Sequence, residues 1–329
     1  MAVRARRLKI SERRPSRLSP GQQARRGDEQ RARVDLLIAR TLGQRGRDHT
    51  QALALAAEAR LLAEKLEYGD GRARAYAAEA EIYLDDARYP EAIASSRKAW
   101  QLQRLRAPAA ALDALIRIGH ALLALGRKHG ALAIYKRAFI ASETLPENHR
   151  ILPLRSIGKV LWAMARKAEA KKYYQAALKI AERCGDQRQL GNLHVGLGNI
   201  AWIPDQDARA AQRHYRKAWE AYGKMEDSAG QAAVAGNLAG HYSDLKNYDA
   251  ARLWIVRALR LARQAKDRRA MLYIRINLAQ ILNAQGRPAA ARRHLRTVEA
   301  QALKAGEQHA LQAAREALAA RKRPAAGAR

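Results

Sequence analysis

The chain has 329 residues, of which 62 are Lys or Arg and 31 are Asp or Glu, so its formal net charge is +31. The single cysteine, Cys184, excludes a disulfide framework within the chain and suits a reducing compartment. No apolar run approaches the roughly 18–20 residues of a membrane span, and the basic N-terminus is followed by no apolar signal segment. We therefore expect a cytoplasmic protein without a membrane partner.

Residues 1–27 hold nine basic residues against one acidic residue, Glu12, and offer little to bury. This composition is typical of disorder and predicts a basic, disordered tail. The tail would bind nucleic acid or an anionic surface, or be a passive extension from a start codon assigned too far upstream. The charge of the whole chain favours polyanionic partners. The alternative is that an Arg-rich composition places arginine on every solvated helix face.

From residue 28 to 307 the sequence divides into seven repeats. Each repeat carries two small residues seven positions apart, with a larger residue between them. Offsets of four and seven lie on one face of a helix, so every repeat would bury the same stripe. A fixed period of 39–41 residues predicts a solenoid. The paired positions are Ala52 and Ala59, Ala92 and Ala99, Ala131 and Ala138, Ala170 and Ala177, Ala211 and Ala218, Ala251 and Ala258, and Ala291 and Val298.

A second helix precedes each of these stripes and follows one template, an apolar residue followed by Gly or Ala and, three residues later, a large apolar residue. It is seen in "RIGHALLALG", "SIGKVLWAMA", "GLGNIAWIPD", "NLAGHYSDLK" and "NLAQILNAQG". The repeat "AGNLAGHYSDLKNYDAARLWIVRALRLA" shows both helices and the turn between them. Its template residues are Leu238, Ala239, Tyr242, Ala251, Ile255 and Ala258.

This pattern resembles the tetratricopeptide repeat, W-x2-L-G-x2-Y…A-x3-F…P over 34 residues. The length of about 40 residues resembles the long variety found in kinesin light chains and bacterial signalling proteins. The resemblance implies an all-α fold, a right-handed α-solenoid of stacked antiparallel helix pairs. The first two repeats depart from it, with Glu79 at the usual Leu position and Ser96 at the usual aromatic one. The turn around "WIPDQD" has one extra residue, and residues 308–329 are expected to form a capping helix and a basic tail.

The sequence contains no catalytic constellation. No H-E-x-x-H or C-x-x-C motif occurs, and Gly196 and Gly198 lie within a helix template instead of following a strand. We therefore predict neither an enzyme nor a bound metal or cofactor.

The resemblance also implies where a ligand would bind, because the first helix of each repeat lines the concave face in this family. The groove positions lie two and one before the template Leu and two and five after it. In this sequence they are Arg117, His120, Arg155, Ser156, Lys159, Trp162, Asn199, Trp202, Asn237, Asn277, Gln280 and Asn283.

These groove residues suit a peptide ligand. The amides of Asn237 and Asn277 can each donate to and accept from an extended backbone. The basic side chains of Arg117, Arg155 and Lys159 would bind carboxylates or phosphates of the ligand. Trp162 and Trp202 would be apolar anchors. The opposing interpretation is that the asparagines are ordinary solvated residues and that Trp162 belongs to the core.

Three functions remain open. The leading hypothesis is a non-catalytic scaffold that binds an acidic protein or peptide segment in the groove. The second is a sensory or regulatory module of bacterial signalling or transcription control, acting in trans on a separate output domain. The third, supported by charge alone, is a nucleic-acid-associated protein that uses its basic tail and surface. The sequence does not predict the oligomeric state.

Overall fold

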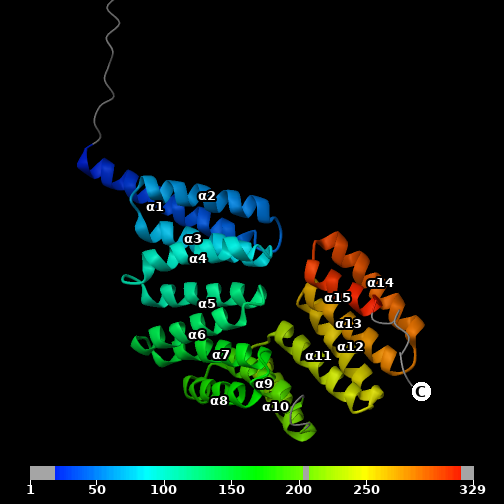
Figure 1. Ribbon diagram of the computed structural model, residues 1–329. Helices are drawn as coiled ribbons and strands as arrows, with labels where there is room; N and C mark the ends of the chain where they lie inside the picture. Colours follow the sequence, from blue (N-terminus) through cyan, green and yellow to red (C-terminus); the bar gives the residue numbers. More distant parts are fainter. Residues whose placement is uncertain (1–18, 203–206, 320–329) are drawn as a thin grey trace, which may run out of the picture. The chain divides into compact units, whose positions relative to one another are not determined.

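The computed structural model describes residues 19–202 and 207–319, and all regular structure in these ranges is helical (Figure 1). The predicted all-α fold is confirmed. The chain divides into two compact units, Met1–Ile134 and Tyr135–Arg329, with the boundary inside one helix. The sequence period shows no such division. No helix in the described ranges combines the length and apolar character that crossing a bilayer requires.

The first unit consists of consecutive helix pairs. Each helix packs against its chain neighbour, and α3 also contacts α1 and α5, the other first helices of their pairs. The elements are α1 (Pro20–Gly43), α2 (His49–Lys65), α3 (Gly69–Asp85), α4 (Tyr89–Gln103), α5 (Pro108–Ala124) and the start of α6 (Lys128–Ala141).

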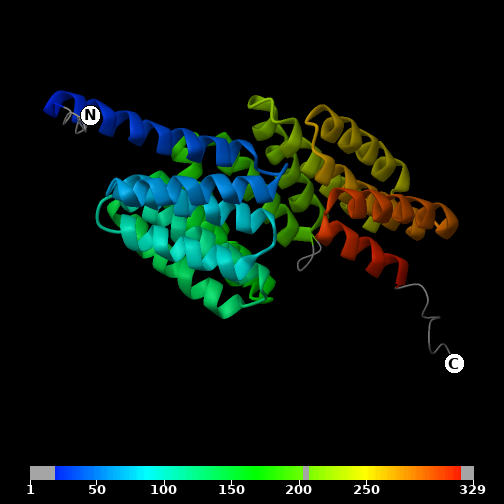
Figure 2. The same cartoon turned by 90° about the horizontal axis from the view of Figure 1, so that it is seen from above.

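The second unit is also built from helix pairs, and each helix from α7 to α15 packs against its chain neighbour. Figure 2 shows α11 to α15, coloured yellow-green to red, lying beside one another. The elements are η1 (Ser142–Thr144), η2 (Glu147–Arg150), α7 (Ile151–Ala163), α8 (Lys167–Cys184), α9 (Gln187–Trp202), α10 (Ala208–Lys224), α11 (Ser228–Asp244), α12 (Tyr248–Gln264), α13 (Arg268–Ala284), α14 (Pro288–Ala305) and α15 (Gln308–Ala319). The extra residue predicted in "WIPDQD" falls on residues 203–206, outside the described ranges.

The first helix begins earlier than the predicted tail allows. The prediction of disorder up to residue 27 is wrong for residues 20–27, because Ser19 forms a capping box with Gln22. The Ser19 hydroxyl accepts from the Gln22 amide at 3.3 Å, and the Gln22 side chain accepts from the Ser19 amide at 2.9 Å. This reciprocal cap satisfies two amides at the helix start. Residues 1–18 of the predicted tail lie outside the described ranges.

One turn geometry recurs between helices. After α11, Lys246 adopts a left-handed conformation with φ +58°, and the Asn247 amide donates to the Tyr242 carbonyl at 2.9 Å. Such a bond closes the end of a helix, and a left-handed residue is needed to form it. The Asn247 side chain then accepts from the Ala250 amide at 3.1 Å and begins α12. Gly126 and Gly286 occupy the equivalent left-handed position in their repeats.

The alanines of the repeat lie in the seams between helices. Every paired position predicted from the period is buried, and Ala251 and Ala258 are 0% exposed. The small template residue on the first helix is matched in size to the large residue that it faces on the second helix. Gly158 and Gly198 face the rings of Tyr174 and Tyr215 so closely that an added Cβ would lie within 2.8 Å of them.

Where the partner on the second helix is smaller, the template residue on the first helix is alanine. Ala239 shares a core cluster with Ile255, and Ala279 shares one with Leu295. Small residues in one helix therefore compensate for large residues in the next, which keeps the packing dense along the stack.

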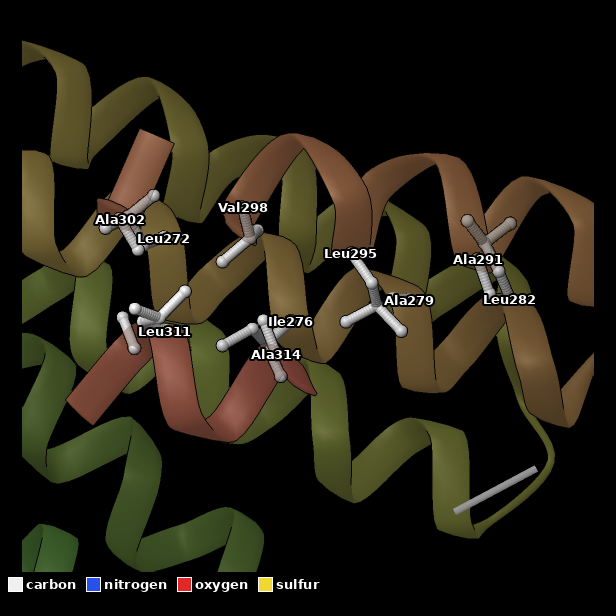
Figure 3. Close-up of a cluster of buried hydrophobic side chains, with 11 residues drawn as sticks. Leu272, Ile276, Ala279, Leu282, Ala291, Leu295, Val298, Ala302, Leu311 and Ala314 are labelled. Carbon is white, nitrogen blue, oxygen red and sulfur yellow. The ribbon is translucent and has the colours of Figure 1, made fainter. Parts of the chain in front are cut away.

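The last helix closes the core of the final repeat. In Figure 3, Leu311 and Ala314 of α15 point into the stripe formed by α13 and α14. Leu295 and Val298 of that stripe are at most 2% exposed. A terminal repeat would otherwise leave this apolar stripe in water, so α15 acts as a cap for the array.

Candidate functional site

The first helices of the repeats share one face within the second unit. In this unit α7 contacts α9, α9 contacts α11, and α11 contacts α13. The template Leu, which is the apolar residue before the Gly or Ala, points toward the paired helix, so the residues one before it and two or five after it turn toward this shared face. The second unit therefore carries a continuous inner face built from α7, α9, α11 and α13.

A pocket of about 370 Å³ opens on this inner face between α9, α11 and α13. Four of the residues predicted for the groove line it, namely Trp202, Asn237, Asn277 and Gln280. The lining is completed by Gly236, Gly240, Ser243, Asp244, Ile281 and Ala284. The structure therefore brings together amides from two neighbouring helices beside a half-buried indole.

Two glycines create the space for this pocket. A Cβ on Gly236 would lie 3.7 Å from the Asn277 Nδ2 atom, and a Cβ on Gly240 would lie 3.3 Å from the Trp202 ring. Glycine inside a helix costs about 0.5–1 kcal/mol relative to alanine. Both positions lie in the middle of α11, so the helix keeps an unfavourable residue where a side chain would fill the pocket. Neither glycine occupies the small-residue position of the template, which is Ala239 in this helix, so the template does not predict this role.

Aromatic contacts hold the Trp202 wall in place. Its ring meets the His241 ring edge-to-face, with centroids 5.4 Å apart. His241 is 1% exposed and also packs against Tyr215 and Tyr242. Burial lowers the pKa of His241, although the charge of Asp244 raises it, so the ring is neutral at pH 7. The indole is thus fixed by a neutral aromatic cluster.

Asp244 gives the pocket a rim with acidic character. Its side chain is exposed at the end of α11, and burial by the surrounding helices raises its pKa. A carboxylate in this position attracts a cationic or hydrogen-bond-donating group. Neither the repeat template nor the groove offsets predicted this residue.

Two cations lie farther along the same unit on α7. Burial lowers the pKa of the half-buried Arg155 guanidinium, which is surrounded by the hydroxyl-bearing rings of Tyr174 and Tyr222. The Lys159 side chain is exposed, yet burial by neighbouring protein and the charge of Arg155 lower its pKa. Neither residue forms an ion pair with a carboxylate of the described ranges. Partly desolvated cations without a partner attract anions more strongly than solvated ones.

Several predicted groove residues have partners within the fold. The Asn199 Oδ1 atom accepts from the Tyr215 hydroxyl at 2.7 Å, so this amide supports the repeat core. The Asn283 Oδ1 atom is buried without a hydrogen-bond partner in the described ranges and does not line the pocket. Ser156 is buried in α7. Trp162 is half-buried, with the Lys167 ammonium 5.6 Å from its ring centroid.

Arg117 and the half-buried His120 belong to α5 of the first unit. Arg117 lines a separate pocket of about 400 Å³ there, together with Arg45 and Glu81. Its guanidinium contacts the Glu81 carboxylate at 3.3 Å, and Arg45 contacts the same carboxylate at 2.9 Å. Arg117 therefore belongs to a pocket within the first unit, where Glu81 partly neutralises its charge. The described residues include no group of three His, Cys, Asp or Glu side chains arranged to hold a metal ion.

Comparison with known families confirms what the repeat predicts. Models of the tetratricopeptide repeat match residues 112–139 and 156–184 in one case and residues 230–304 in another. The chain contains tetratricopeptide repeats. The matched ranges include α11 and α13, whose residues line the pocket. The resemblance to the long variety of about 40 residues stays a prediction.

Solved structures with the same fold include proteins from two Bacillus species. Aspartyl phosphate phosphatase F from Bacillus subtilis aligns with a TM-score of 0.67 at 13% identity, covering 85% of this tetratricopeptide repeat chain and 72% of its own. The quorum sensor NprR from B. thuringiensis aligns with a TM-score of 0.62 at 17% identity, covering 77% and 71%.

A third similar structure is the Rap conjugation gene regulator of the plasmid pLS20 in complex with the Phr* peptide. It aligns with a TM-score of 0.55 at 14% identity, covering 88% of this chain and 93% of the regulator. At identities this low, the structural alignments establish the shared helical repeat fold alone. The comparison with curated protein sequences gave no match.

Proposed function

We propose that this tetratricopeptide repeat protein binds a peptide or protein segment along the inner face of its second unit, without catalytic chemistry of its own. The observation that carries the proposal is the pocket in which Asn237, Asn277 and Gln280 surround an open volume beside Trp202. Peptide sites combine an apolar anchor with a few oriented polar groups, and this pocket has both.

The two asparagines supply the backbone recognition in this proposal. Each side-chain amide offers one acceptor and two donor hydrogens, so it can pair with both the N–H and the C=O of a peptide bond. Asn237 and Asn277 project from adjacent helices into one pocket. An extended segment crossing α11 and α13 would meet them in succession, and its side chains would be free to contact Trp202.

Charge orients the ligand. Arg155 and Lys159 on α7 favour a carboxylate, whereas Asp244 at the end of α11 disfavours one. We therefore propose that the ligand is acidic at the end that reaches α7. At the other end, over α11 and α13, it would be neutral or basic. An oppositely oriented ligand would place like charges together at both ends.

A regulatory role is the second candidate, and the structural comparisons favour it. The Rap regulator of plasmid pLS20 is described in complex with a peptide, and NprR is described as a quorum sensor. If this chain works in the same manner, peptide binding would alter its association with a separate output protein. This candidate uses the same pocket and adds a downstream partner.

The test is selection of peptides from a phage-displayed library of random 12-residue sequences, followed by fluorescence anisotropy with the selected peptides. Asn237→Ala and Asn277→Ala should each weaken binding about fivefold to tenfold, because each removes hydrogen bonds worth about 1 kcal/mol net. Asn148→Ala is the matched control, because Asn148 is an exposed asparagine of η2, away from the inner face of α7–α13. Equal effects of all three substitutions would refute the pocket as the binding site.

The charge pattern has its own measurement. Arg155→Gln should weaken binding of selected peptides that carry an acidic residue near one end and leave neutral peptides unaffected. Asp244→Asn should strengthen the binding of acidic peptides. If neither Arg155→Gln nor Asp244→Asn changed the affinity of any selected peptide, the proposed ligand orientation would be wrong. The proposal that the pocket binds the peptide would be unaffected.

A further inference from the structure

The outer helices of the second unit carry a large excess of positive charge. The second helices of its repeats, α8, α10, α12 and α14, hold 18 basic residues against five acidic ones. The balance is five to two on α8, five to one on α10, and four to one on each of α12 and α14. The excess recurs in every repeat of this unit.

An Arg-rich composition does not account for this excess. The corresponding outer helices of the first unit, α2 and α4, hold four basic residues against three acidic ones. These helices have a similar length and the same position in the repeat, and they carry the same buried stripe. If arginine simply filled every solvated face, α2 and α4 would be as basic as α10 and α12.

Six arginines of α10, α12 and α14 point away from the core. They follow the first buried alanine of the stripe in their helix by one, two, five or nine residues, which places them on the solvated side of each helix. All of the following are exposed. We call them the basic outer face: Arg213 and Arg216 on α10, Arg252 and Arg260 on α12, and Arg293 and Arg296 on α14.

The basic outer face lacks internal charge partners. None of its six arginines forms an ion pair with another described residue, whereas Arg33, Arg45 and Arg60 of the first unit contact carboxylates at 2.5–3.2 Å. Unpaired like charges on neighbouring helices repel one another and concentrate counterions. A polyanion that displaces those ions relieves the repulsion, so this face is suited to binding one.

We propose that the basic outer face binds double-stranded DNA through its phosphates. Duplex DNA presents one negative charge per about 1.7 Å of its axis, whereas an acidic peptide has at most one per residue, about 3.3 Å. Arginine also matches the geometry of phosphate oxygens with two parallel donors. A continuous phosphate backbone is best contacted by a surface with many dispersed arginines and few carboxylates, and the basic outer face has both properties.

The aromatic residues of these helices exclude base stacking as the main contact. Trp219 of α10 and Trp254 of α12 pack against each other with ring centroids 5.4 Å apart. Single-stranded nucleic acids depend on exposed aromatic rings for their affinity, whereas duplex binding through phosphates does not. The proposed binding is therefore independent of DNA sequence and sensitive to salt.

The test uses the full chain and a 30-base-pair DNA duplex in fluorescence anisotropy at several NaCl concentrations. The test variant combines Arg216→Gln, Arg260→Gln and Arg296→Gln, one on each helix. The control variant combines Arg47→Gln, Lys65→Gln and Arg97→Gln, three exposed residues of the first unit, and has the same net charge.

The plot of log K against log salt should lose about 0.9 in slope for each phosphate contact removed, or about 2.7 for the test variant. At 0.1 M NaCl each contact is worth roughly eightfold, so the test variant should bind on the order of 500-fold more weakly. The control should stay within about threefold of the parent. Circular dichroism of both variants checks that they fold.

Three results would overturn the proposal. The first is an equal loss in the control, because binding would then follow net charge and not this face. The second is duplex affinity that does not change with salt. The third is tighter binding of the same face to poly-glutamate, to phosphatidylserine vesicles or to a single-stranded 30-mer than to the duplex. Asn277→Ala should leave DNA binding unchanged, which separates this surface from the peptide pocket.

Discussion

Two glycines in equivalent helices should respond in opposite directions to the same substitution. Gly236 in α11 has no heavy atom closer than 3.7 Å to the position of an added Cβ. Gly236→Ala should therefore gain the helix-propensity difference of about 0.5–1 kcal/mol without a steric cost. For a unit of this size, that corresponds to an increase of about 1–4 °C in the midpoint of thermal unfolding.

Gly198 in α9 faces a different environment. A Cβ there would lie 2.7 Å from the Cε1 atom of Tyr215, whose ring is 0% exposed and whose hydroxyl donates to Asn199. The ring is held on both sides and cannot move aside easily. Overpacking costs about 1–3 kcal/mol, which exceeds the propensity gain, so Gly198→Ala should lower the free energy of unfolding.

The assay for this pair is thermal unfolding followed by circular dichroism, with the peptide anisotropy measured in parallel. Gly236→Ala should unfold at a higher temperature yet bind selected peptides more weakly, because the added methyl group projects into the pocket toward Asn277. If both substitutions shifted the midpoint in the same direction, the size matching between helices would be the wrong explanation of the template.

Three further outcomes test the packing and the electrostatics. Ala258→Leu should lower the free energy of unfolding by roughly 1–3 kcal/mol, measured by urea denaturation, because Ala258 is 0% exposed in a seam. Burial, and secondly His214, lower the pKa of His194 to about 4, whereas an unfolded histidine titrates near 6.5. The unfolded chain then binds the proton first, so stability should fall as the pH drops from about 6.5 to about 4, by up to about 3 kcal/mol, and His194→Asn should flatten that decline. Gly240→Ala should displace Trp202, whose ring lies 3.3 Å from the new Cβ, and shift its fluorescence emission; an unchanged spectrum would show that the pocket wall is not held as described.

The sequence predicted the positions of the groove asparagines correctly, but it did not predict the partner of the groove cation Arg117. Asn237 and Asn277 line one pocket because they lie one residue before a template Leu in adjacent repeats, and helix periodicity then determines their face. Arg117 occupies an analogous position, yet its guanidinium contacts Glu81, 36 residues earlier in the chain. Long flexible side chains choose partners across helices, and no local spacing specifies which partner is close enough.

The degenerate second repeat shows the same limit. The sequence marks Glu79 as a departure from the template without indicating how a carboxylate is accommodated there. In the structure it is 8% exposed and accepts from the Arg60 guanidinium and the Ser95 hydroxyl, both at 3.2 Å. These donors come from α2 and α4, so only the assembled repeats satisfy the buried charge.

The sequence alone determined the repeat, its period, the antiparallel helix pairs and the buried alanine seams. These features follow from local periodicity, because the face of a helix that a residue occupies depends only on its offset along the chain. Only the tertiary structure decided which offsets face open space. The pocket at Gly236, the acidic rim at Asp244 and the unpaired arginines of the basic outer face each depend on side chains from different helices. Those distances are set by how the helices stack, so the same template yields a core amide at Asn199 and a pocket amide at Asn237.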